Sequence, residues 1–170
     1  MKKILFSLVT LVLTACSNGY DKYVGYWSLD DSKSQNILEI RKEGKETYLV
    51  NENILNQYKK EQVLEKGDKD ALSVNTGFGV IALNLSEDGN TLRIKNQKYS
   101  KMNETDAKKA LDNQNACNDL EKKYREETKD LNIFAKEQGD KKIEISKQYV
   151  ELQKKIPNCS FYISTPSKAF

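Results

Sequence analysis

The feature that most constrains the fold is an abrupt change in residue pattern near residue 103. Between residues 23 and 102, short runs rich in β-branched and aromatic residues are separated by turn-forming residues, as in antiparallel strands. Between Asn103 and Gln138 there is no glycine or proline, which is typical of helix. We therefore predict an α+β chain, in which an antiparallel up-and-down β-sheet or small barrel is followed by a C-terminal α-helical hairpin.

Eight segments of the N-terminal half have the length and composition of strands. Apolar and polar residues alternate clearly at 92–95, which indicates one buried and one solvated face. Residues 52–58 are ambiguous between a loop, a strand and a helical turn. The predicted strands are 23–29, 37–42, 47–51, 62–66, 71–75, 79–85, 91–95 and 98–102.

The first predicted strand contains Gly25-Tyr26-Trp27. This Gly-x-Trp resembles the start of lipocalins and of smaller lipocalin-like domains. The resemblance implies a barrel in which Gly25 allows close approach of chains and Trp27 plugs the closed end. Strands of about five residues indicate a barrel smaller than a full calyx, without a roomy ligand cavity. The alternative is that Trp27 is simply a core residue.

The second half has the marks of two helices. Asn103 can cap the first helix, and Asp106 stands in a capping-box position. The first helix is predicted to continue to Gln138, and Gly139-Asp140 to form the turn before a second helix that ends at Pro157. The first apolar stripe contains Ala110, Cys117, Tyr124 and Leu131, with Leu120 and Phe134 in the alternate register, and the second contains Ile143, Tyr149, Val150 and Leu152.

The three cysteines of the chain are Cys16, Cys117 and Cys159. If Cys16 is modified, the remaining even pair in an exported chain indicates a disulfide. With a turn at Gly139 and ~1.5 Å of rise per helical residue, Cys117 and Cys159 finish at the same level. We therefore predict a Cys117–Cys159 bond that closes the hairpin; two separate reduced cysteines are the alternative.

The N-terminus has the composition of an export signal. Lys2 and Lys3 precede an uncharged run over residues 4–13, which is shorter than the roughly 20 residues of a spanning helix. The run ends in Leu13-Thr14-Ala15-Cys16, which resembles the lipobox of bacterial lipoproteins. The alternatives are an ordinary secretory signal and a buried N-terminal helix.

The lipobox resemblance implies cleavage before Cys16, acylation of this cysteine with diacylglycerol and palmitate, and attachment to a membrane through the lipid. Ser17 follows the cysteine in place of the aspartate associated with inner-membrane retention. The implied address is the periplasmic face of a Gram-negative outer membrane. We predict four regions: 1–15 signal peptide, 16–19 lipidated tether, 20–102 lipocalin-like β-module, and 103–170 helical hairpin with a short C-terminal tail.

The composition is poor in catalytic chemistry. The chain has no histidine, and therefore lacks the commonest general base and the commonest nitrogen ligand for zinc. Without Lys2 and Lys3, 26 basic residues stand against 25 acidic ones, so net charge gives no reason to bind nucleic acid. Paired carboxylates such as Asp30 and Asp31 are interpreted as turn residues. We expect no catalytic residues, no metal, no cofactor and no nucleic-acid partner.

Two functional hypotheses follow. The first is a non-catalytic binding or inhibitory module of the cell envelope, whose partner is an envelope protein or a small apolar ligand. The second is a structural subunit that docks onto a larger envelope assembly through its helical hairpin. The candidate contact residues are Tyr124, Leu131, Phe134 and Trp27, together with the rim of the β-module. Alternatively, packing between the helices buries these apolar side chains. An exposed apolar face on the hairpin would favour docking, and an open cavity behind Trp27 would favour ligand binding.

Overall fold

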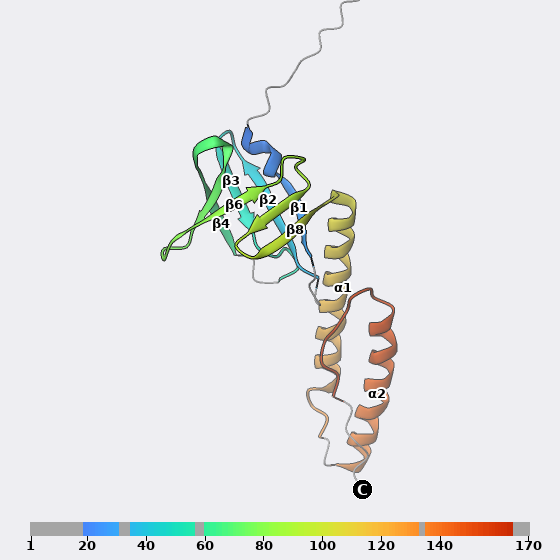
Figure 1. Cartoon of the computed structure of the whole chain (residues 1–170). Helices are drawn as coiled ribbons and strands as arrows, with labels where there is room; N and C mark the ends of the chain where they lie inside the picture. The colour runs from blue at the N-terminus through green and yellow to red at the C-terminus, as the bar shows by residue number, and fades with distance from the viewer. Residues whose placement is uncertain (1–18, 31–34, 57–59, 133–134, 165–170) are drawn as a thin grey trace, which may run out of the picture.

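The computed structural model describes residues 19–30, 35–56, 60–132 and 135–164. In this part of the chain a closed β-barrel is followed by two long antiparallel helices (Figure 1). This arrangement confirms the predicted α+β order. The elements are η1 (Gly19–Tyr23), β1 (Gly25–Leu29), β2 (Ile37–Glu43), β3 (Thr47–Asn51), β4 (Glu61–Lys66), η2 (Asp68–Asp70), β5 (Leu72–Asn75), β6 (Val80–Leu85), β7 (Thr91–Ile94), β8 (Gln97–Met102), α1 (Glu104–Thr128) and α2 (Lys136–Lys154).

The barrel has up-and-down topology. Each strand pairs antiparallel with the next, and β8 pairs with β1, as in the register Trp27 opposite Lys101. All eight predicted strands are present, with bounds that differ from the prediction by at most two residues. The ambiguous segment after β3 is an irregular connection, of which residues 57–59 lie outside the described part.

One end of the barrel is closed by η1. Its Tyr20 hydroxyl donates to the Gly67 carbonyl in the β4–β5 connection, and Asp21 pairs with Lys42 at the end of β2. Tyr23 reaches deepest, and its hydroxyl donates to the Leu83 carbonyl at 3.2 Å. The helix thus bonds to several strands at the same end of the sheet.

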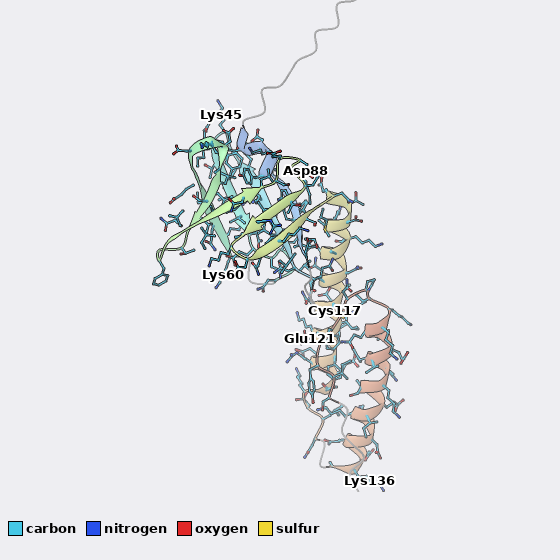
Figure 2. The ribbon with its side chains drawn as sticks, viewed as in Figure 1. Lys45, Lys60, Asp88, Cys117, Glu121 and Lys136 are labelled. Atoms are coloured by element: carbon cyan, nitrogen blue, oxygen red, sulfur yellow. A yellow bond between two sulfur atoms is a disulfide. The ribbon has the colours of Figure 1, made fainter. Side chains whose placement is uncertain are left out.

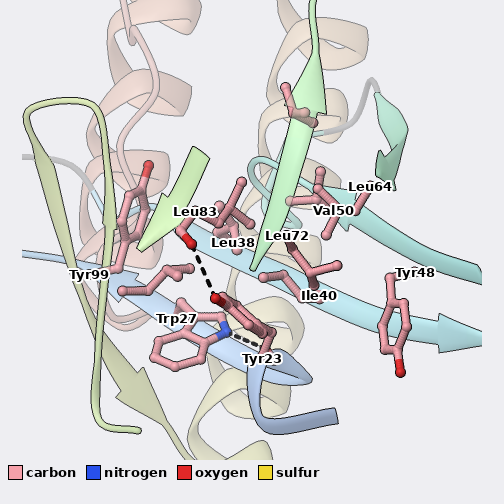
Figure 3. Close-up of a cluster of buried hydrophobic side chains, with 12 residues drawn as sticks. Tyr23, Trp27, Leu38, Ile40, Tyr48, Val50, Leu64, Leu72, Leu83 and Tyr99 are labelled. Atoms are coloured by element: carbon pink, nitrogen blue, oxygen red, sulfur yellow. Dashed lines mark hydrogen bonds between the residues drawn. The ribbon is translucent and has the colours of Figure 1, made fainter. Parts of the chain in front are cut away.

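Trp27 and Gly25 show why the Gly-x-Trp sequence suits this end. Trp27 is completely buried, and its indole N–H donates to the Tyr23 carbonyl at 3.0 Å (Figure 3). The Lys101 ammonium lies over the Trp27 ring. Gly25 has φ +137°, a conformation that side chains rarely adopt. A Cβ there would meet its nearest neighbour, Lys101 Cε, at an ordinary 3.6 Å. The glycine is therefore required by backbone conformation and not by close approach of chains.

The first turns of α1 attach the helices to the outside of the barrel. The Asn103 side chain accepts from the Asp106 amide at 2.8 Å and confirms the predicted cap. Ala107 and Ala110 then pack on Ile37 at the start of β2 and on Ile54 and Leu55 of the β3–β4 connection. Beyond this contact α1 continues past the barrel, and Figure 2 shows Lys136 at the far end of the hairpin.

The predicted turn at Gly139 is wrong. The chain turns between Thr128 and Lys136, and Gly139 is a buried residue inside α2. The Thr128 hydroxyl donates to the Tyr124 carbonyl, the Leu131 amide donates to the Thr128 carbonyl, and α1 ends there. A glycine within a helix costs only about 1 kcal/mol, so its presence does not force a turn.

The predicted disulfide joins Cys117 of α1 to Cys159, with their Cα atoms 5.3 Å apart. The two cysteines can still meet although the turn comes earlier than predicted. From this turn α2 runs ~27 Å back toward the barrel, which is more than the ~17 Å of α1 between Cys117 and Thr128. The end of α2 therefore lies near the barrel, where Asn158 donates to the Gln35 side chain.

After Cys159 the chain packs against the helices and covers Tyr124. The Phe161 ring lies 6.1 Å from the Tyr124 ring, and the Ser164 amide donates to the Tyr124 hydroxyl. The Ser146 hydroxyl donates to the Ser164 carbonyl at 2.8 Å. Nearby, burial and a hydrogen bond to Glu127 raise the pKa of Tyr149 to about 12, so this phenol remains a donor at neutral pH.

Candidate functional site

The candidate site is a cavity inside the barrel, at the end opposite η1. It has a volume of about 230 Å³ and is bounded by the last residues of β3, β5 and β7 and the first residues of β2, β6 and β8. Its apolar wall is formed by Leu38, Val50, Val74, Ile81, Leu83, Ile94 and the ring of Tyr99.

Strand alternation places these side chains inside. In β6 the residues Ile81 and Leu83 face the barrel interior, whereas Val80 between the turn and Ile81 is largely exposed. Leu83 also connects the cavity to the closed end, because its carbonyl accepts the hydrogen bond from Tyr23 (Figure 3). The barrel thus has a plugged end built on Tyr23 and Trp27 and a hollow end lined by aliphatic side chains.

Four polar residues complete the lining: Asn36, Glu52, Lys95 and Gln97. The Tyr99 hydroxyl donates to Gln97 Oε1 at 3.0 Å. Burial, with a smaller effect from Glu52, raises the pKa of Tyr99, so the phenol stays neutral at physiological pH. Asn36 Oδ1 is buried and has no hydrogen-bond partner among the residues that the structure describes. The cavity thus combines an aliphatic wall with polar groups that include the charged Glu52 and Lys95. Small-molecule sites commonly combine apolar walls with a few polar groups.

The β5–β6 hairpin projects at this same end of the barrel. Its turn is fixed by Gly77 at φ +78° and by the Thr76 amide, which donates to the Gly79 carbonyl. Phe78 at the tip is fully exposed, and Val80 is 63% exposed. The sequence has no charged residue from 71 to 86, although charged residues make up 31% of the chain.

The residues proposed from the sequence as a contact surface are not together on a surface. Trp27 is buried in the barrel and Tyr124 is buried between the helices, as in the alternatives in which Trp27 is a core residue and helix packing buries Tyr124. Leu131 is half-buried, and Phe134 and Cys16 lie outside the described residues. The large apolar side chains exposed on the described part of the hairpin and tail are Leu152 and Tyr162, which form no extended apolar face.

Sequence reasoning missed Asn36, Tyr99 and Phe78. The charge-free run 71–86 was a usable signal for the exposed hairpin. No local pattern marks Asn36, because its burial depends on strands that are distant in sequence. The sequence analysis expected no roomy cavity, and the volume of about 230 Å³ lies below the 300–1,000 Å³ that is common for pockets of drug-sized ligands.

The described ranges contain no group of three or more side chains suited to holding a metal ion. No helix in the same ranges has both the length and the apolar character needed to cross a bilayer.

The fold is an eight-stranded, up-and-down antiparallel barrel with a lipocalin-like arrangement of strands, followed by a disulfide-closed helical hairpin. Comparison of the chain with protein-family models, curated proteins and solved structures gave no match.

Proposed function

We propose that this protein is a lipid-anchored envelope lipoprotein whose barrel binds a small apolar ligand without changing it chemically. The observation that carries the proposal is the cavity at the end of the barrel opposite η1. Burial of an apolar ligand in such a chamber contributes about 25 cal/mol per Å² of surface removed from water. The volume of about 230 Å³ favours one short chain or a small ring over a large lipid.

The location of η1 supports an anchor on one side of the barrel. Gly19 begins η1 at the closed end, only two residues after Ser17. Figure 2 shows Lys45 at this end and Lys60 at the opposite end, with Lys136 farther still along the hairpin. A short tether at Cys16 would therefore hold the closed end near the bilayer and leave the cavity facing away from it.

We expect Cys16→Ser to abolish membrane attachment, because its hydroxyl cannot receive the lipid that a cysteine thiol does. Fractionation of cells would place the wild-type protein with the outer membrane and the variant in the soluble periplasm. Mass spectrometry of the wild-type N-terminus should show an acylated Cys16. If the variant remains in the membrane fraction at the wild-type level, the anchor proposal fails.

A second candidate is recognition of an envelope protein, as an inhibitory module or as a structural subunit. The exposed Phe78 and Val80 favour the rim of the barrel for such a contact. The helical hairpin offers less apolar surface. Among the described residues of its two helices, Leu152 is the only large apolar side chain that is exposed, and its exposed fraction is 40%. We prefer ligand binding because the cavity is already shaped, whereas the rim presents a small apolar area.

Binding can be tested with the fluorescent apolar probe N-phenyl-1-naphthylamine and two variants of neighbouring residues. Ile81→Trp fills the cavity and should weaken probe binding at least about tenfold, which corresponds to ~1.4 kcal/mol. Val80→Trp adds the same side chain on the outer face of the same strand and should bind like the wild type. Equal loss in both variants, or no saturable binding to the wild type, would refute the proposal.

A further inference from the structure

The rim of the cavity carries two opposite charges on facing walls of the barrel. Glu52 directly follows β3, Lys95 directly follows β7, and both line the cavity. In the closed order from β1 to β8 these two strands are four positions apart in either direction, so they lie on opposite walls. Both residues are exposed to solvent, and a molecule that enters the cavity can therefore reach them.

Neither charge is balanced by a counter-charge in the described part of the chain. The ion pairs found there include neither Glu52 nor Lys95, so the two residues do not pair with each other. Glu52 Oε1 accepts from Gln62 Nε2 at 3.0 Å, but a carboxylate can accept from several donors. The rim therefore offers an ammonium on one side and a carboxylate with spare acceptor positions on the other.

The backbone at Lys95 gives an independent reason to assign its side chain a role. Lys95 is the first of two residues between the paired Ile94 and Gln97, and its φ is +52°. Glycine or asparagine usually occupies such a position in a two-residue hairpin, because a Cβ is crowded at positive φ. Strained residues of this kind are often found at functional sites.

We propose that the ligand is a zwitterion of the α-amino acid type, with its apolar side chain in the barrel, its ammonium on Glu52 and its carboxylate on Lys95. This inference rests on the proposed function and specifies the ligand class of the same site. The aliphatic wall lies below the two charges, between the rim and the plugged end. One molecule can thus contact all three parts of the site.

The dimensions of the cavity agree with such a ligand. A sphere with its volume of about 230 Å³ is ~8 Å across, whereas the amino nitrogen and carboxylate oxygens of an α-amino acid are only ~3 Å apart. Charge-assisted hydrogen bonds of ~2.8 Å on both sides lengthen this span to about 8–9 Å. A molecule with one charge could satisfy only one wall and would leave the other charge without a partner.

The test measures displacement of N-phenyl-1-naphthylamine from the full-length protein by three molecules that share a hexyl chain. 2-Aminooctanoate carries both charges, octanoate lacks the ammonium, and 2-aminooctane lacks the carboxylate. The wild type should bind 2-aminooctanoate about tenfold more tightly than either analogue, the ratio expected for one charge-assisted hydrogen bond.

Two variants should each remove one half of this preference. In Lys95→Met the preference over 2-aminooctane should fall to about one, and in Glu52→Gln the preference over octanoate should do so. Lys60→Met is the control, because Lys60 lies at the same end of the barrel (Figure 2) but not in the cavity lining, and it should keep both preferences. Lys95→Gly should behave like Lys95→Met and unfold at a higher urea concentration, because glycine adopts positive φ without strain.

The outcomes separate this inference from the proposed function. If the wild type binds the three molecules equally, ligand binding stands and the roles of Glu52 and Lys95 are wrong. Equal loss of preference in Lys60→Met would show an effect of overall charge and would also overturn the inference, as would earlier unfolding of Lys95→Gly, which would make Lys95 a stabilising turn residue. If neither the probe nor any of the three molecules binds, the proposed function itself fails.

Discussion

Trp27→Ala is expected to lower the free energy of unfolding of the barrel by ~3–5 kcal/mol, the usual cost of truncating a fully buried large aromatic residue. Trp27 has no exposed surface, and its indole N–H donates a hydrogen bond to the Tyr23 carbonyl of η1. The Lys101 ammonium over its ring would lose its partner as well. Because the whole stability of a domain is commonly about 5–15 kcal/mol, this change would remove a large part of it.

Urea unfolding followed by circular dichroism would measure the effect, since Trp27 is the only tryptophan and its fluorescence is lost in the variant. Phe78→Ala is the matched control. It also removes a large aromatic side chain from the barrel, but one that is fully exposed, and should change stability by no more than about 0.5 kcal/mol. Equal effects of the two substitutions would show that Trp27 is not the buried centre of the closed end.

Loss of the Cys117–Cys159 bond is expected to destabilise the hairpin by ~4 kcal/mol, from the chain entropy of a loop of 42 residues. Apolar packing between the described residues of the two helices is thin, because the large apolar residues buried on their facing sides are Tyr124 and Tyr149. Amide hydrogen exchange in α2 should accelerate by about a thousandfold in a Cys117→Ala, Cys159→Ala double variant.

The barrel should respond differently, because its core is formed by residues of η1 and the strands alone. Exchange in β2 and β6 should therefore change little in the double variant. A reducing agent should reproduce the effect in the wild type and add nothing to the variant. Simultaneous loss of protection in strands and helices would mean that the hairpin and barrel unfold as one unit, contrary to this expectation.

The strands could be predicted because their signals are local. Turn residues such as Gly44, Gly77 and Gly89 adopt positive φ, and β-branched residues alternate between them. Closure of the sheet into a barrel was left open, because it depends on the pairing of β1 with β8 across more than 70 residues. No local pattern encodes that contact.

The turn of the hairpin was missed for the opposite reason. Gly139 gave a local signal, but packing overrides a weak helix breaker, and the end of α1 is set by the bonds around Thr128. Tyr124 was proposed as a contact residue because helical periodicity cannot show what covers a residue. Its cover comes from Phe161 and Ser164, in a tail without periodicity.

The most direct test of the central claim is an NMR titration of the side-chain methyl groups with 1-octanol, repeated with octyl methyl ether. The account predicts saturable shifts at Leu38, Val50, Leu83 and Ile94, which line the cavity. The methyl groups of Ile37, which is buried between barrel and α1, should not shift. Saturable shifts confined to the outer face or to the helical hairpin, or no saturable shifts with either molecule, would contradict ligand binding in the barrel.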